Sequence, residues 1–266
     1  MGTVSRYQSK PLDILPFRTL EGFYQAFNYK PSNCNEKLTS FTIQQLMAVR
    51  TPVKFYYDIL SPFSWVAFES LCRYQKAWNL DLQLKPMDLN EVVSLSGNKP
   101  PGMIRSKGLL LLRDIQRLAD MMDLPYKRLA DFEQTVYKRG SIPTLTTLAA
   151  CQIMFPKHLE ELSRQAWLGL HSRDIDITDQ KNIKQFAEAA QIPDIDKLIE
   201  FSLSEEARQQ LNDNMIEALD SKCFGAPWFT VTNPNTGKRE KFFGSDRIEM
   251  LGWVLGKEYM GLQPPQ

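Results

Sequence analysis

Two incomplete α/β patterns, separated by a long helical block, constrain what this chain can fold into. VKFYYD, beginning at Val53, is rich in the β-branched and aromatic residues of a strand. Ser61-Pro62 fits the N-cap and first position of a helix that should run to about Trp78. DLQLKPMDL (Asp81–Leu89) then alternates as a second strand. The length and helical nature of this connection imply that the two strands are parallel.

The second pattern lies near the C-terminal end of the chain. WFTVTNP, shortly after Gly225, predicts a strand, and KREKFFG predicts its returning partner. The turn cluster Asn233–Gly237 between them favours a hairpin. Ser245-Asp246 then opens a further helix. Neither pattern can bury its sheet faces alone, so we expect both to contribute to one sheet.

Helical periodicity dominates residues 98–220. Leu111, Ile115, Leu118 and Met122 recur at helical spacing, and Ser204 is suited to cap a later helix. The predicted fold is therefore α/β and thioredoxin-like, in the order βαβ…ββα, with an inserted all-helical domain. We assign residues 51–108 and 221–266 to the thioredoxin-like domain and 109–220 to the insert. Residues 1–50 form an N-terminal extension that is either poorly ordered or a targeting segment.

Composition narrows the function classes. Lys+Arg 32 against Asp+Glu 31 leaves no basic excess that would favour nucleic acid or an anionic membrane surface. No apolar run approaches the roughly 18 residues of a membrane span. The four cysteines (Cys34, Cys72, Cys151 and Cys223) are widely separated, and only two histidines are present. We expect no metal site, and buried thiols in a reducing compartment.

Ser61-Pro62-Phe63-Ser64 occupies the place where a thioredoxin-type fold holds its C-x-x-C motif, but serine replaces both cysteines. A hydroxyl cannot form a mixed disulfide, which excludes dithiol–disulfide exchange by this motif. The free N–H groups and positive dipole end of the helix still favour an anion. A hydroxyl at Ser61 can donate a hydrogen bond to a bound thiolate. The alternative is that Ser61 only caps its helix.

Two further motifs belong to the second pattern. Ala226-Pro227 stands at the start of a strand, where thioredoxin folds keep a cis-proline that exposes the preceding backbone for pairing with an extended peptide. A trans proline at a strand edge is the alternative. Ser245 and Asp246 can bind the ammonium and carboxylate of an α-amino acid end, or can simply cap a helix.

A Gly/Pro-rich loop completes the set. SGNKPPG (Ser96–Gly102), followed by Lys107, can receive a carboxylate, or it is a solvated linker into the helical block. The predicted fold brings the motifs at Ser61, Pro227 and Ser245 to one end of the sheet, within reach of this loop. Together they describe a pocket for a small peptide with a thiol and two charged ends, and glutathione fits that description.

These motifs resemble the kappa-class glutathione transferases. The matching stretches, in the family's order from about Val53 to Pro265, are LSPFSWVAFESLCRYQKAWNLDLQLKP, SGNKPPG, FGAPWFTV and FGSDRIEMLGWVLGKEYMG. The resemblance extends to 2-hydroxychromene-2-carboxylate isomerases and, more distantly, to DsbA-like oxidoreductases. It implies a thioredoxin domain with an inserted helical domain, usually in a homodimer.

The resemblance also implies roles for single residues. The family's thiolate-stabilising serine falls on Ser61, which would be the catalytic residue. Its glutathione-contacting asparagine and lysine fall on Asn98 and Lys107. One departure is Phe63, where the family commonly has tyrosine and therefore an additional hydroxyl.

On the C-terminal side, the residue before the family's cis-proline falls on Ala226, with the proline itself at Pro227. Its backbone would pair with glutathione. The serine and aspartate that hold the γ-glutamyl end fall on Ser245 and Asp246. Larger apolar residues are common in the family at Ala226, so the second-substrate pocket is expected to be wider here.

The activity that the resemblance implies is conjugation of the glutathione thiolate to small electrophiles, as in detoxification, with glutathione peroxidase activity as a further expectation. Glutathione would be the co-substrate, without a metal. Two alternatives remain open: a glutathione-dependent isomerase of the 2-hydroxychromene-2-carboxylate type, which releases glutathione unchanged, and a non-catalytic adaptor with the same fold.

The expected compartment is the mitochondrial matrix or the peroxisome, where members of this family are found, with the cytosol as an alternative. The first 50 residues are moderately basic but contain Asp13, Glu21 and Glu36, which is not a clean transit peptide. The chain ends in QPPQ and lacks an SKL-type peroxisomal tail. We slightly favour the mitochondrion.

Overall fold

The computed structural model describes residues 50–264, and Arg50–Gln266 form one compact unit. The extension predicted at residues 1–50 lies, except for Arg50, outside the described residues. The strands are β1 (Thr51–Tyr57), β2 (Leu80–Pro86), β3 (Trp228–Thr232) and β4 (Arg239–Phe243). The α-helices are α3 (Pro62–Ala77), α4 (Leu89–Ser96), α5 (Arg105–Met122), α6 (Ile142–Met154), α7 (Leu159–Arg173), α8 (Gln180–Ala189), α9 (Ile195–Ser202), α10 (Glu205–Asp220) and α11 (Ile248–Leu255). Short 3₁₀ segments are η1 (Pro101–Met103), η3 (Pro156–His158) and η4 (Ser245–Arg247), and η2 (Gln134–Arg139) is π-helical.

The four strands form one mixed sheet in the order β2-β1-β3-β4. β1 runs parallel to β2, with Phe55 opposite Leu84, and antiparallel to β3, with Phe55 opposite Phe229. β4 is the antiparallel partner of β3. The predicted parallel pair, the predicted hairpin and the thioredoxin-like α/β fold are therefore confirmed.

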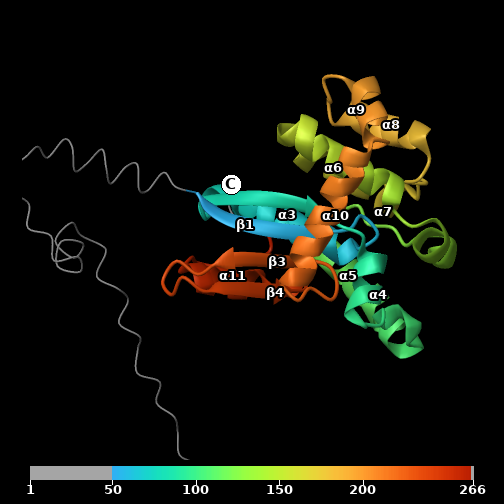
Figure 1. Cartoon of the computed structure of the whole chain (residues 1–266). Coiled ribbons are helices and arrows are strands. Elements are labelled where there is room, and N and C mark those ends of the chain that lie inside the picture. The colour runs from blue at the N-terminus through green and yellow to red at the C-terminus, as the bar shows by residue number, and fades with distance from the viewer. Residues whose placement is uncertain (1–49, 265–266) are drawn as a thin grey trace, which may run out of the picture. The chain divides into compact units, whose positions relative to one another are not determined.

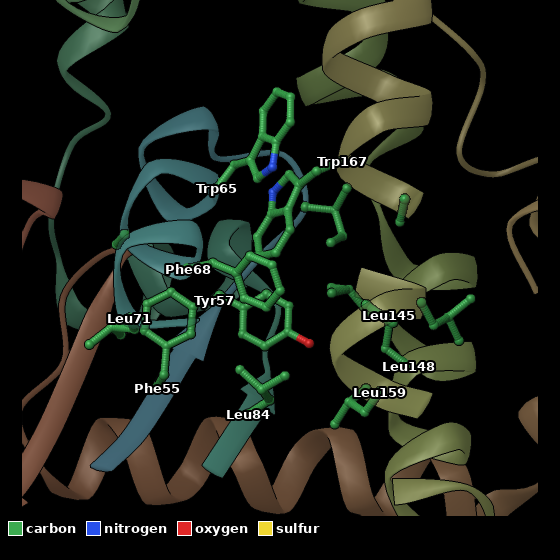
Figure 2. Close-up of a cluster of buried hydrophobic side chains, with 14 of the residues drawn as sticks. Phe55, Tyr57, Trp65, Phe68, Leu71, Leu84, Leu145, Leu148, Leu159 and Trp167 are labelled. Atoms are coloured by element: carbon green, nitrogen blue, oxygen red, sulfur yellow. The ribbon is translucent and has the colours of Figure 1, made fainter. Parts of the chain in front are cut away.

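One face of the sheet shares a hydrophobic core with the inserted helices. Tyr57 of β1 and Phe68 of α3 both pack on Trp167 of α7, with ring centroids 5.1 and 4.8 Å apart. Figure 2 shows these three rings together, with Leu145 and Leu148 of α6 beside them. Truncation of such a buried ring costs about 3–5 kcal/mol. The insert is thus anchored on the sheet by a shared core, and the domain boundaries drawn from the sequence stay a prediction.

The opposite face of the sheet is covered by α10, which crosses it in Figure 1. Tyr56 points to this face because neighbouring strand residues alternate, and it packs in a cluster with Met215 and Ala218 of α10. Glu217 of the same helix forms an ion pair with Lys85 of β2 at 3.4 Å. The central strand β1 is consequently buried on both faces.

β2 ends earlier than predicted, and a helix follows it. The strand was expected to extend to Leu89, but it stops at Pro86, and Leu89 begins α4. The carboxylate of Asp88 caps this helix by accepting the N–H of Asn90 at 2.9 Å and of Glu91 at 3.3 Å. Met87-Asp88-Leu89 therefore leads into a helix. Over only three residues, alternation of apolar and polar residues cannot separate the end of a strand from the start of a helix.

The longer inserted helices follow the predicted periodicity. Ile115 and Met122 of α5 are buried, and the Ser204 hydroxyl caps α10 by accepting the N–H of Ala207 at 3.2 Å. Within residues 50–264, no helix is both long and apolar enough to cross a membrane.

Candidate functional site

The loop between β1 and α3 places Ser61 at the N-cap of α3. Its backbone is extended (φ −89°, ψ 108°), Pro62 follows in the first turn, and its Oγ accepts the N–H of Ser64 at 3.1 Å. None of the described residues accepts a hydrogen bond from the Ser61 hydroxyl. Ser61 therefore caps the helix and also keeps its hydroxyl hydrogen for donation to an anion at the helix N-terminus.

Three residues before this serine, a buried carboxylate supports the loop. Asp58 is 0% exposed, and its two oxygens accept the N–H of Leu60 at 3.0 Å and the N–H of Leu89 at 2.9 Å. Burial raises the pKa of this carboxyl to about 7, against the opposing effect of its two hydrogen bonds. Asp58 thus links the β1–α3 loop to the first residue of α4.

A buried histidine supports the same loop from α7. The Nε2 of His171 lies 3.0 Å from the carbonyl oxygen of Ile59, which requires Nε2 to carry the proton that it donates. Its other ring nitrogen, Nδ1, is buried without a hydrogen-bond partner among the described residues. Burial lowers the pKa of His171 to about 4, so this ring is neutral near neutral pH.

The loop after α4 is tied to the segment before the proline. Gly97 caps α4 in the left-handed conformation (φ 70°), and the side-chain amide of Asn98 donates to the carbonyl oxygen of Phe224 at 2.7 Å. Asn98 therefore already joins two loops of the site. Any ligand contact of Asn98 would use its backbone or require its amide to be shared.

The peptide bond between Ala226 and Pro227 is cis. The carbonyl oxygen of Pro227 accepts the N–H of Gly244 at 3.1 Å, which brings the start of η4 beside it. Ser245 is buried, whereas Asp246 is exposed and pairs with the guanidinium of Arg247 at 2.6 Å. Gly244 has a φ of 104°, and a Cβ there would press against the Asp246 carboxylate, so glycine is required at this turn.

These hydrogen bonds join most of the loops that carry the predicted site residues. The β1–α3 loop is bonded to α4, the loop after α4 to Phe224, and Pro227 to Gly244. Lys107 lies apart, exposed in the first turn of α5, and its amine bonds to no other residue in the part of the chain that the structure describes. The ligand contacts of all these residues stay predictions.

Comparisons with known proteins decide the family. The model of the DSBA-like thioredoxin domain matches residues 52–255. Glutathione S-transferase kappa 1 of Homo sapiens is 37% identical over 215 residues, which cover 80% of this chain and 94% of that protein. The chain belongs to the kappa class of glutathione transferases. The Rattus norvegicus kappa 1 enzyme is 36% identical over the same shares of the two chains. A solved structure of 2-hydroxychromene-2-carboxylate isomerase, at 21% identity, superposes with a TM-score of 0.64 over 77% of this chain and 94% of that one, which shows the common fold.

In this kappa-class chain the described cysteines are poor nucleophiles. Cys72, Cys151 and Cys223 are free thiols. Burial raises the pKa of all three, to about 12 for Cys151 and Cys223, so they stay protonated near neutral pH. Cys34 lies outside the described residues. Among residues 50–264, no group of His, Cys, Asp and Glu could hold a metal ion.

Two buried residues that hold the β1–α3 loop, Asp58 and His171, were missed by reasoning from the sequence. An acidic residue directly after a strand core, as Asp58 is in YYDILSP, is a signal that could have been used, because buried carboxylates need backbone donors. His171 carries no such signal. It follows the loop that it supports by 112 residues, and only the fold brings the two together.

Proposed function

We propose that this protein binds glutathione and joins it, through its sulfur, to a small electrophile. The single observation that carries the proposal is the Ser61 hydroxyl, which accepts the Ser64 N–H and has no acceptor for its own hydrogen among the described residues. At the N-terminus of a 16-residue helix, such a donor stabilises a thiolate. Kinship with glutathione S-transferase kappa 1 supports glutathione as the source of that thiolate.

In the proposed reaction, the glutathione thiol loses its proton to solvent, and the Ser61 hydroxyl donates a hydrogen bond to the resulting sulfur anion. With an activated aryl halide as the electrophile, the thiolate attacks the carbon that bears the halogen, a carbon–sulfur bond forms, and the halide leaves with the electrons of the broken carbon–halogen bond. A free thiol has a pKa of about 8.5, so at neutral pH only a few per cent is ionised. Lowering that pKa by one unit raises the ionised fraction at pH 7 about eightfold.

The remaining predicted residues would orient the peptide. The ammonium of Lys107 would pair with a glutathione carboxylate, the Ala226 backbone with the peptide backbone, and Ser245 and Asp246 with the γ-glutamyl end. Asp246 already pairs with Arg247, which could itself take up the γ-glutamyl carboxylate. Asn98 would contribute beside its bond to Phe224.

The oligomeric state, the compartment and the physiological role that we propose are supported by the family resemblance and not by the geometry of the site. The enzyme would be a homodimer, would be found in the mitochondrial matrix or the peroxisome, and would take part in detoxification. A hydroperoxide would be reduced to an alcohol and water by two glutathione molecules, which leave as the disulfide. Sedimentation and the N-terminal sequence of the mature protein test the first two features.

Ser61→Ala tests the catalytic assignment, with Ser64→Ala as the matched control. The Ser64 side chain is fully buried, whereas Ser61 is 7% exposed, so a ligand at the start of the helix can contact Ser61 and not Ser64. We expect Ser61→Ala to raise the pKa of the bound glutathione thiol, which can be measured from the absorbance of the thiolate. We also expect it to lower kcat/KM at neutral pH about tenfold or more. Ser64→Ala should leave the pKa of the bound thiol and kcat/KM unchanged. An unchanged pH profile in Ser61→Ala would show that the assignment is wrong.

Product analysis separates the proposed transferase from an isomerase. With isotope-labelled glutathione, a transferase places the label in the product, whereas an isomerase returns it unchanged. Calorimetry tests the alternative that the protein is a non-catalytic adaptor. If no heat of binding is seen at millimolar glutathione, the protein is not the proposed enzyme.

A further inference from the structure

A cavity of about 360 Å³ lies between α5 and the segment that follows it. Its lining residues are Leu109, Leu112, Arg113, Gln116, Tyr126 and Arg128. The four from α5 are spaced i, i+3, i+4 and i+7, so they form one stripe along about 10 Å of the helix. A cavity of this size falls at the lower end of the range for small-ligand sites.

The lining combines an apolar wall with positive charge. Leu109, Leu112 and the Tyr126 ring provide the wall, and no acidic residue lines the cavity. Neither Arg113 nor Arg128 forms an ion pair with another described residue. Arg117, on the same helix but outside the cavity, does pair with Asp114 at 2.9 Å. Two unpaired guanidinium groups beside an apolar wall suit an aromatic molecule that carries an anionic group, because guanidinium matches a carboxylate in shape and charge.

Packing connects this cavity to the Ser61 loop. The Tyr126 ring contacts the His171 ring, with centroids 6.0 Å apart, and His171 in turn holds the Ile59 carbonyl at 3.0 Å. Tyr126 also packs in one cluster with Phe63 and Val66 of the first turns of α3. Through Tyr126, the cavity therefore adjoins the residues that hold the Ser61 loop and the start of α3.

We propose that this cavity is the electrophile site, and that it favours aromatic electrophiles with a carboxylate or similar anionic substituent. The inference rests on the proposed transferase function. The ring of the acceptor lies against Leu112 and Tyr126, its anionic group faces Arg113 and Arg128, and its reactive carbon points toward the sulfur at Ser61.

Two matched acceptors test the role of charge: para-chloro-meta-nitrobenzoate and the corresponding para-chloro-meta-nitrobenzamide, which is neutral. Arg113→Gln and Arg128→Gln, singly and together, are compared with wild type for each acceptor. We expect KM for the benzoate to rise about tenfold in the double variant, as loss of charge-assisted contacts would give. KM for the benzamide and for glutathione should change less than about twofold.

Arg117→Gln is the matched control, since it removes one positive charge from the same helix without touching the cavity. It should leave the benzoate KM unchanged. An equal loss with benzoate and benzamide, or an equal effect of Arg117→Gln, would overturn the inference while leaving the transferase function standing.

Direct binding separates the two proposals. Meta-nitrobenzoate lacks a leaving group, and its binding can be followed by quenching of intrinsic fluorescence without glutathione. Binding to wild type that weakens about tenfold in the double variant supports the anion site even if no acceptor is conjugated, in which case the transferase proposal fails by itself. Binding that is absent, or equal in wild type and double variant, contradicts the site.

Discussion

The carboxylate of Asp58 accepts the backbone N–H of Leu89 at 2.9 Å, across 31 residues of sequence. Its other oxygen accepts the N–H of Leu60, the residue before Ser61. One buried side chain therefore fixes the β1–α3 loop against the helix that leads to Asn98 and the SGNKPPG loop.

Asp58→Asn should damage both stability and catalysis. The amide keeps one acceptor oxygen but turns its NH₂ group toward a backbone N–H, so one buried donor loses its partner. We expect a loss of about 1–3 kcal/mol in the free energy of unfolding and a lower kcat/KM for conjugation. Asp88→Asn is the control: Asn caps helices as well as Asp does, so α4 should keep its stability. Equal denaturation midpoints for Asp58→Asn and wild type would contradict the bracing role.

The raised pKa of Asp58 predicts how stability depends on pH. The carboxyl titrates near 3.8 when unfolded and at about 7 when folded, so the folded state holds its proton more tightly. Its contribution to stability is then fully present below about pH 3.8 and is lost as the pH rises through about 7. The free energy of unfolding is measured with urea across this pH range for wild type and for Asp58→Asn. The value for wild type minus the value for Asp58→Asn should fall as the pH rises. A flat difference would mean that the folded pKa is not raised.

The lowered pKa of His171 predicts that stability depends on pH in the opposite direction, over an overlapping pH range. Its pKa is lowered from 6.5 to about 4, so the unfolded state binds the proton more tightly. The stability contribution is present above about pH 6.5 and is lost as the pH falls through about 4. The free energy of unfolding of wild type minus that of His171→Gln should therefore fall toward acid pH. The two effects partly cancel in the wild type, and only the single variants separate them.

Gly169 tests the packing of α7 on α8. In an isolated helix, Gly→Ala stabilises by about 1 kcal/mol. Here the added Cβ would overlap the Cζ and Cε1 atoms of the buried Phe186 ring. Overpacking of this kind costs about 1–3 kcal/mol, and we expect it to exceed the gain in propensity. Thermal unfolding of Gly169→Ala should show a lower Tm, while Gly102→Ala, where a Cβ meets open space, should stay near wild type.

Local patterns were sufficient for much of the fold and part of the site. Strand alternation and the Ser-Pro pair predicted β1, α3 and the N-cap at Ser61, because each depends on neighbours within a few residues. The position after Gly225 was singled out for a cis-proline, and the Ala226–Pro227 bond is cis. The short helix α4 was missed because eight residues carry too little periodicity to separate it from the strand before it.

The sequence by itself determined most of the secondary structure, the absence of cysteine at the start of α3, and the residues that relate this chain to the kappa class. Only the tertiary structure decided what surrounds Ser61. The bonds of Asp58 to Leu89, of His171 to Ile59 and of Asn98 to Phe224 join residues 31, 112 and 126 positions apart. No local preference specifies such pairs. The bonds of Asp58 and His171 form because burying a polar group without a partner costs more than the chain can recover elsewhere. The bond of Asn98 is exposed, and it forms because the fold brings two distant loops together.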